Sequence, residues 1–562
     1  MTALQQLPWL VLAQVVRRVM EPGGQLRRGA NEVRGDKPAE ALVPLLCTCR
    51  ALRAAALGQM CHAYALSVSG RLGSARGELS RWPDSVPGAR GREHARLVRR
   101  VRLAVDLWSI ISGRAAQVVD AQRLVLPAAR TLTLSLEHSE IAEDEPAGDA
   151  GPAVRAFVGT LRAMMPCLRD VHLEHSAGYA MSRPHYREAL TRQLADALAD
   201  ALAVPATDAV GAGMAALLLL PPPPPPRLTS IAFSWNMYHR ATVQLVHNSA
   251  ATLRALTVAF NHLADVGLLV ADATGAAVAY PALEELRLSC WYYLEVPLVR
   301  PCTTHVPFPR LRLLALDMDY PFADDTLFRG NAETLAVLSM NVDANTIAMT
   351  RRHRLFDGVA RRLGRLQHVR VKNINTSRLK PGAPARQVAE FALRLAATGA
   401  QTLTIEDITM ERASVVPLLL GGDRSCAQLD SLQVLAIPDA ALTLVHIAAL
   451  LARLPQLVEL RCHFAGLGLD PHGGDDALLR FASEHEGRAR FFAVLRLGHF
   501  GDTFVENIAR AAMALTIMCP RFTVPTVPSH LARPLGAAIA RLMATAHVAP
   551  FQPRFAPLLS RL

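Results

Sequence analysis

The feature that most constrains the fold is a short apolar phrase that recurs along the chain. It reads apolar-x-x-apolar-x-apolar, as in Leu283-x-x-Leu286-x-Leu288. In a β-strand, positions 4 and 6 of this phrase point to the same side, and position 1 turns inward just before the strand. Each copy therefore has one apolar edge that it cannot bury alone, so the pattern predicts that successive copies stack on one another.

Fourteen copies of this repeat phrase can be placed, mostly about 30 residues apart. They begin at Val98, Ala129, Leu168, Leu228, Leu253, Leu283, Leu311, Leu335, Leu366, Ala400, Leu432, Leu457, Phe492 and Ala512. Between strands, helices or irregular segments must return the chain to the next strand. The pattern predicts an α/β leucine-rich-repeat solenoid, a horseshoe of strand-helix repeats, over residues 98–522.

The long gap between Leu168 and Leu228 predicts an insertion at about 176–226. It ends in six prolines, Pro221–Pro226, which favour a polyproline II segment. Such a segment suits either binding of an SH3-like or WW-like domain or a stiff spacer. Residues 523–562 contain several prolines and one short expected helix, so they are interpreted as a C-terminal cap.

Residues 1–62 differ from the repeats, because their apolar residues recur at helical spacing. Pro8 stands where a helix would start, a position at which its missing N–H costs little. The small helical unit expected here cannot bury much by itself and needs a partner. The following segment, 63–97, is interpreted as transitional, with a candidate first strand in YALSVSGRL.

The helical unit contains the phrase LPWLVLAQVVRRV, followed by ALVPLLCTCRALRAAAL. Together these phrases resemble an F-box, which typically opens with Leu-Pro and an apolar helix and closes with a Val-Cys-Arg-x-Trp-like phrase. Leu52 stands where the tryptophan is usual, and the loop between the two halves is long. An F-box followed by leucine-rich repeats is the layout of divergent F-box/leucine-rich-repeat proteins found in fungi. The residues that carry the resemblance are Leu7, Pro8, Leu12, Val16, Leu45, Leu46 and Cys49.

This resemblance implies a substrate-recognition subunit of a cullin-RING ubiquitin ligase. The N-terminal helices would bind a Skp-type adaptor, which links to the cullin, and the solenoid would hold an unknown protein target. The alternatives are a non-catalytic interaction scaffold whose F-box is degenerate and, less favoured, a nucleic-acid-binding solenoid.

The fifth position of each phrase lies between the buried positions and faces the concave side of the expected sheet. Five of these fourteen positions are Arg and none is acidic, but neighbouring positions of the same face include acids such as Glu285, Glu406 and Glu459. We therefore expect a face of mixed charge with a basic emphasis in its C-terminal half. Arg on a rigid sheet suits bidentate contact with carboxylate or phosphate, although a solvated sheet surface has the same composition. The candidate target-binding residues are Arg102, Arg287, Arg370, Lys372, Arg461 and Arg496.

Composition and motifs argue against other functions. No nucleophile elbow, P-loop or metal-ligand spacing occurs, and the nine cysteines form no C-x-x-C, so we expect no enzyme activity, catalytic residue, metal or cofactor. The net charge of +12 raises nucleic-acid binding, but aromatics make up only 5% and no basic run occurs. The N-terminus lacks a basic region before its apolar stretch, so we expect a cytoplasmic or nuclear protein with no membrane partner.

Overall fold

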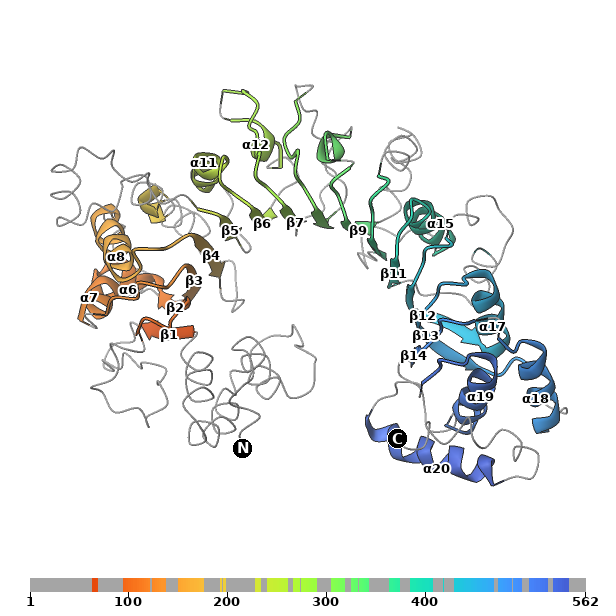
Figure 1. Cartoon of the computed structure of the whole chain (residues 1–562). Coiled ribbons are helices and arrows are strands. Elements are labelled where there is room, and N and C mark those ends of the chain that lie inside the picture. Colours follow the sequence, from red (N-terminus) through yellow and green to blue (C-terminus); the bar gives the residue numbers. More distant parts are fainter. Residues whose placement is uncertain are drawn as a thin grey trace, which may run out of the picture. The chain divides into compact units, whose positions relative to one another are not determined.

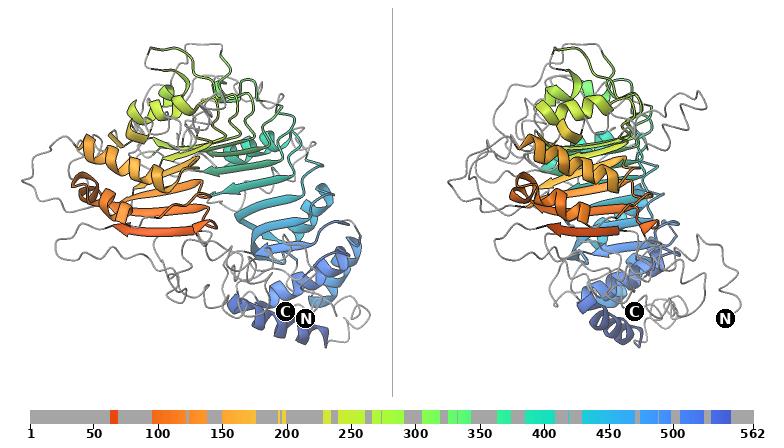
Figure 2. Two further views of the ribbon diagram at one scale, coloured as in Figure 1. Left: turned by 60° about the vertical axis from the view of Figure 1, so that its left-hand side comes forward. Right: turned by 90° about the vertical axis from the view of Figure 1, so that its left-hand side faces the viewer.

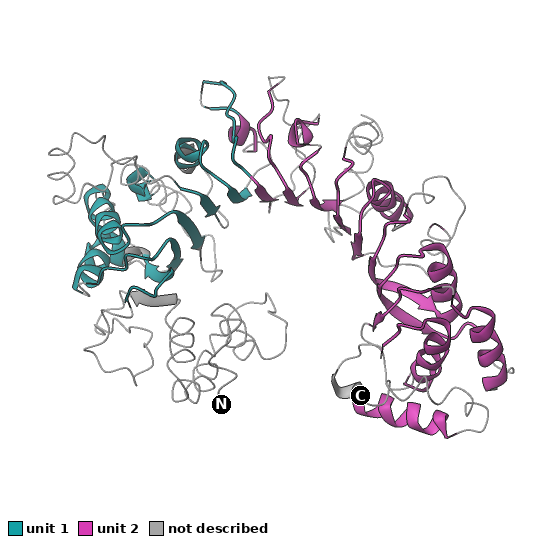
Figure 3. Ribbon diagram, viewed as in Figure 1, with its two compact units in different colours: residues 1–261, 271–283 teal, residues 262–270, 284–562 magenta. Residues whose placement is uncertain are grey.

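A computed structural model of the chain divides the repeats into two compact units (Figure 3). Unit 1 comprises residues 1–261 and 271–283, and unit 2 comprises residues 262–270 and 284–562. The structure describes residues 63–68, 95–121, 124–137, 150–175, 193–194, 196–198, 228–233, 240–260, 266–272, 274–290, 305–318, 325–331, 333–342, 363–373, 385–407, 418, 429–469, 474–487, 489–497, 505–523 and 529–544.

In unit 1 the strands β1 to β6 form a parallel sheet in chain order, with helices in the connections (Figure 1). The strands are β1 (Ala63–Val68), β2 (Arg100–Asp106), β3 (Thr131–Glu137), β4 (Asp170–His175), β5 (Ser230–Phe233) and β6 (Ala255–Phe260). The helices are α6 (Leu107–Ile111), α7 (Arg114–Ala121), α8 (Gly151–Met164) and α11 (Arg240–Ser249).

In unit 2 the strands β7 to β14 form a parallel sheet in the same way. The strands are β7 (Glu285–Cys290), β8 (Leu313–Asp317), β9 (Val337–Val342), β10 (His368–Asn373), β11 (Thr402–Glu406), β12 (Val434–Thr443), β13 (Glu459–Gly466) and β14 (Val494–Leu497). The helices are α12 (Gly267–Val270), η3 (Thr326–Phe328), α15 (Ala385–Ala396), α17 (Leu444–Arg453), α18 (Gly474–Glu484), α19 (Val505–Met518) and α20 (Ser529–Met543). Figure 2 shows that α15 and α17 lie on one side of the strands.

The strand register explains why the phrase repeats. Equivalent positions of neighbouring strands stand opposite each other, so that Leu286 pairs with Leu314 and Leu288 with Leu316. Positions 1, 4 and 6 are buried throughout; Leu283, for example, is fully inaccessible to solvent. Stacking therefore gives each apolar edge the cover that it cannot find within one repeat. The strand-helix leucine-rich-repeat fold is confirmed, and each unit is a stretch of such a solenoid.

Backbone hydrogen bonds also link the repeats at position 2, just before each strand. The N–H of Arg312 donates to the carbonyl of Glu284 at 2.8 Å, and the N–H of Gln367 donates to Ala336 at the same distance. A hydroxyl just before position 1 adds a second link in several repeats. Thr334 Oγ1, for example, donates to the carbonyl of Leu311 at 2.8 Å. Backbone carbonyls just before each strand would otherwise lack a hydrogen-bond donor, and the next repeat supplies one.

Strand β1 confirms the candidate first strand and pairs in parallel with β2. The parallel sheet of unit 1 therefore includes one strand from residues 63–97, the segment that we interpreted as transitional from the sequence. Thirteen of the fourteen repeat phrases, those from Val98 to Phe492, lead into the expected strands.

The fourteenth strand prediction, at Ala512–Ile517, is wrong, because these residues lie in helix α19. Every residue from Ala511 to Met518 is buried, and Thr516 is the one polar residue among them. A nearly continuous apolar run matches positions 1, 4 and 6 of the phrase, but it lacks the alternation of buried and exposed residues that a strand shows. Its alanines favour a helix. The next repeat start is instead Phe522, whose ring stacks on Phe492 with centroids 5.8 Å apart.

The backbone confirms this register, since Thr523 N–H donates to the carbonyl of Ala493 at 2.8 Å, as position 2 does in other repeats. Helix α20 lies within the region interpreted as a C-terminal cap and packs against α19. The proposed F-box residues, the other residues of 1–62 and Pro221–Pro226 lie outside the described residues.

Candidate functional site

The candidate site is the face of each sheet formed by positions 3, 5 and 7 of the phrase, which we call the open face. Side chains alternate along a strand, so these positions point away from the buried positions 4 and 6. The alternation is clear in β10, where His368 and Arg370 are exposed while Val369 and Val371 are buried. Parallel strands hold successive open-face side chains in a fixed register.

All six basic residues proposed for target binding lie on the open face, and each forms an ion pair. The pairs are Arg102–Glu174 (3.7 Å), Arg287–Glu285 (3.8 Å), Arg370–Glu406 (2.5 Å), Lys372–Asp407 (3.2 Å), Arg461–Glu459 (2.6 Å) and Arg496–Glu459 (2.6 Å). Carboxylates therefore offset most of the basic character that the fifth positions alone suggested. Arg102 belongs to unit 1 and the other five to unit 2.

In unit 1, Asp170 organises the polar part of the open face. Its carboxylate accepts hydrogen bonds from Thr131 Oγ1 at 3.2 Å and from Thr229 Oγ1 at 2.7 Å. His172 follows on the same strand, and burial lowers its pKa. The nearby charges of Asp170 and Glu174 oppose this shift, and the charge of Arg100 adds to it. His172 is thus held toward its neutral form.

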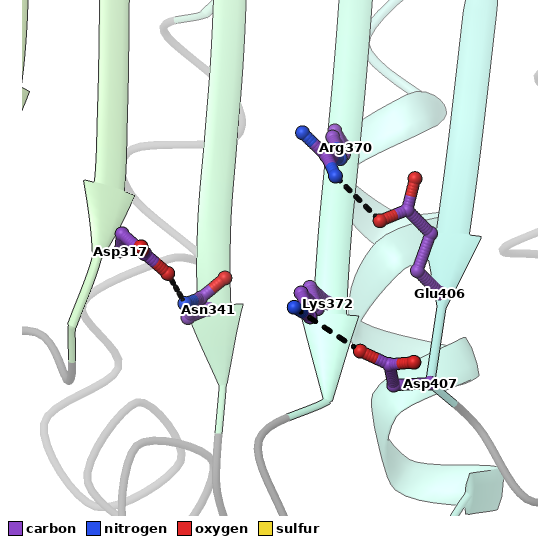
Figure 4. Close-up of polar contacts among 6 residues, drawn as sticks. All are labelled: Asp317, Asn341, Arg370, Lys372, Glu406 and Asp407. Atoms are coloured by element: carbon purple, nitrogen blue, oxygen red, sulfur yellow. Dashed lines mark hydrogen bonds and ion pairs between the residues drawn. The ribbon is translucent and has the colours of Figure 1, made fainter. Parts of the chain in front are cut away.

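In unit 2, polar contacts link β8 to β9 and β10 to β11 (Figure 4). Asn341 donates from its side-chain amide to the carboxylate of Asp317 on the neighbouring strand. On the next two strands, Arg370 and Lys372 each reach a separate carboxylate, Glu406 and Asp407. These contacts join adjacent strands, so they fix side-chain positions on this face.

Asp407 is a partner that the phrase did not predict, because it lies one residue past β11. Its φ is +54°, in the left-handed region that aspartate tolerates better than most residues. The sequence gives only a weak signal for Asp407. It directly follows position 7 of the phrase, but nothing in the phrase indicates its backbone conformation.

At the end of the unit 2 sheet, Arg461 and Arg496 converge on one carboxylate, that of Glu459. Both Nε atoms lie 2.6 Å from Glu459 Oε1. The Glu459 side chain is only 15% exposed, whereas both arginine side chains are about half exposed. Arg461 and Arg496 stand opposite each other on adjacent strands.

Titratable groups suited to metal or nucleophilic chemistry do not gather in the described part of the chain. No group of three or more His, Cys, Asp or Glu residues that could hold a metal ion occurs there. Burial raises the pKa of the Cys462 thiol to about 12, so this cysteine is protonated at neutral pH. Within the described residues, no helix combines the length and apolar character that a membrane crossing requires.

Comparison with known proteins gives structural likeness only. No protein-family model matches the chain, and no curated protein matches its sequence. Among solved structures, the Rad7 and Elc1 complex of yeast is similar at a TM-score of 0.34 and 13% identity, over 72% of this chain and 77% of the matched chain. The leucine-rich-repeat-containing protein LegL7 from Legionella pneumophila is similar at 0.28 and 10% identity, over 80% and 98%.

These TM-scores are too low to carry an argument about fold or function. The class of the protein follows instead from its own strand register and burial: it is a leucine-rich-repeat protein with strand-helix repeats.

Proposed function

We propose that this chain is the substrate-recognition subunit of a cullin-RING ubiquitin ligase. Its N-terminal helices would bind a Skp-type adaptor, and the open face of its repeats would bind a target protein. The chemistry belongs to the partners in this scheme, because the chain only positions the target.

The observation that supports target binding is the open face itself. Its side chains stand on parallel strands in fixed register, and basic and acidic groups form ion pairs on it. Rigid strands position side chains accurately, so little conformational entropy is lost when a partner protein is bound. Mixed charge suits a protein partner better than a nucleic acid, for which a predominantly basic face is expected.

Adaptor binding rests on the F-box resemblance of residues 1–62. The test is purification of the tagged full-length protein from the cells that make it, followed by identification of the co-purifying proteins. We expect a Skp-type adaptor and a cullin with the wild-type chain. Both should be lost with Leu7→Ala combined with Leu12→Ala, since these residues match the F-box opening.

Leu10→Ala is the matched control, because it removes a leucine of the same segment that does not match the motif. It should leave the adaptor bound. Recovery of neither adaptor nor cullin with the wild-type chain would contradict the proposal.

A second candidate is an interaction scaffold whose F-box no longer binds an adaptor. Leu52 favours it, because an F-box usually has tryptophan at this place. The same purification separates the two: the scaffold predicts co-purifying partner proteins without adaptor or cullin, and Leu7→Ala and Leu12→Ala then leave those partners unchanged.

A further inference from the structure

Among the described basic residues at positions 5 and 7 of unit 2 that form ion pairs, only the two around Glu459 share a carboxylate. Arg287, Arg370 and Lys372 each have a carboxylate partner of their own. Arg461 and Arg496 have one carboxylate between them, and both contact the same oxygen atom. Two cations beside one anion leave a single surplus positive charge at this point.

No other acid of the described part removes this surplus by ion pairing. The neighbouring strand β12 contains one acidic residue, Asp439. It is exposed, and it lies where the pairing register with β13 shifts between Ile437 and Ala441. Among the described contacts it forms no ion pair with either arginine. The surplus charge is also accessible, since both guanidinium-bearing side chains are about half exposed.

Short side chains occupy position 5 of the two strands beside Arg461 on the β10 side, namely Thr404 and Ala436. Arg370, Thr404, Ala436, Arg461 and Arg496 stand in register at position 5 of five consecutive strands, β10 to β14, and we call this set the arginine row. Neighbouring strands are about 4.8 Å apart, so Arg370 and Arg461 are separated by about 14 Å. The two residues between them are short, and Ala436 is only 4% exposed. An extended peptide has room to lie between the flanking arginines.

Each guanidinium has donors left for a ligand. The Nε of each arginine lies 2.6 Å from Glu459 Oε1, and the Nη groups remain as a planar set of N–H donors. Two such groups on adjacent strands match the two oxygens of a carboxylate. Charge decides between anions: a carboxylate carries one negative charge, equal to the surplus, whereas a phosphate monoester carries about two near neutral pH.

We propose that Arg461 and Arg496 bind one carboxylate side chain of an extended acidic segment in the partner protein, with the segment lying over Thr404 and Ala436. This deepens the proposed function and rests on it, because the segment would belong to the target protein. The specificity is for Asp or Glu, and Arg370 at the other side of the row contacts the same segment.

The test uses the full-length protein and a fluorescein-labelled peptide of about twelve residues that alternates Glu with Ser. A matched peptide carries Gln at every Glu, and a third carries phosphoserine at the central position. Fluorescence anisotropy at low salt should show binding of the Glu peptide and at least about tenfold weaker binding of the Gln peptide.

Arg461→Gln and Arg496→Gln should each weaken binding of the Glu peptide about three- to fivefold, the range for a half-exposed charge pair. Arg386→Gln is the control, because this exposed arginine lies on helix α15 of the same unit, outside the open face, and pairs with Glu390. It should leave the affinity unchanged.

Glu459→Gln should change the affinity for the Glu peptide in the opposite direction. Removing the carboxylate that competes for both guanidinium groups raises the surplus to two charges, so the Glu peptide should bind about three- to fivefold more tightly. Thermal unfolding of each variant, measured in parallel, shows whether it remains folded.

Equal affinity for the Glu and Gln peptides would overturn the proposal, as would unchanged affinity of the folded Arg461→Gln and Arg496→Gln variants. Tighter binding of the phosphoserine peptide than of the Glu peptide would overturn the assignment of a singly charged ligand. Failure here is distinct from failure of the proposed function, because partner proteins would still co-purify with the wild-type chain if they dock elsewhere on the open face.

Discussion

At the scale of single residues, position within the repeat phrase decides whether a side chain is buried or exposed. Arg370 and Val371 are neighbours in sequence, yet the arginine is exposed and the valine is fully buried. The phrase therefore predicted which basic residues reach solvent. It did not predict their partners, because Arg370 meets Glu406 only through the pairing of β10 with β11.

His172 provides a pH test at this scale. Burial lowers its pKa below the ordinary value of 6.5, against the opposing charges of Asp170 and Glu174. The unfolded chain then binds more protons than the folded chain in the pH window just below 6.5. The stability that depends on neutral His172 is complete above pH 6.5 and falls as the pH drops toward the lowered pKa of the folded state.

We expect His172→Gln to reduce the loss of stability between neutral pH and the lowered pKa. The measurement is the thermal unfolding midpoint as a function of pH for wild type and variant. His368→Gln is the control, because His368 is an exposed open-face histidine on β10. An identical pH profile for wild type and His172→Gln would contradict the expectation.

At the scale of elements, local sequence sets helix ends where caps are present. Helix α17 begins after Thr443, whose Oγ1 accepts a hydrogen bond from the N–H of His446 at 3.3 Å. His446 Nδ1 accepts in return from the N–H of Thr443, also at 3.3 Å. This reciprocal pair satisfies two backbone donors at the helix start.

Thr443→Ala removes the acceptor for His446 N–H, so we expect a loss of about 1 kcal/mol in unfolding free energy. Thr443→Ser keeps the hydroxyl and should recover most of that loss. Chemical denaturation followed by circular dichroism measures both. Equal stability of the Ala and Ser variants would contradict the expectation, because it would show that the hydroxyl does not stabilise the helix start.

At the scale of the whole molecule, the repeats predict that a core defect acts mainly on its neighbours. Each strand of unit 2 pairs only with the strands beside it, and the core runs through successive copies of positions 4 and 6. In such an array, stability is a sum of terms for single repeats and for the interfaces between them.

Leu435→Ala tests whether a core defect acts mainly on the neighbouring repeats. Leu435 is fully buried at position 4 of β12, so the change should cost about 2–5 kcal/mol. Hydrogen exchange should accelerate in β11, β12 and β13 and much less in β7, which is four strands from β11 in the same unit. Thr404→Ala, on the open face, should leave exchange nearly unchanged. Equal acceleration in β7 would contradict the local model.

The sequence by itself determined the repeat fold, the location of thirteen strands and the exposure of the six basic residues. It could do so because alternating burial on a strand requires the period that Leu286 and Leu288 display. The strand predicted at Ala512 is a helix instead, since a short run that is almost entirely apolar fits a strand and a buried helix equally.

Only the tertiary structure decided how the charges of the open face combine. Glu459 and Arg496 lie on separate strands of consecutive repeats, and their contact depends on the pairing of β13 with β14. From the sequence, the position-5 arginines and the acidic residues near them predict a face of mixed charge with a basic emphasis in its C-terminal half. The structure pairs every position-5 arginine with a carboxylate, but Arg461 and Arg496 share one, which leaves a single surplus charge. The sequence could not predict this sharing, because the energy of an ion pair depends on distance in space and not on composition.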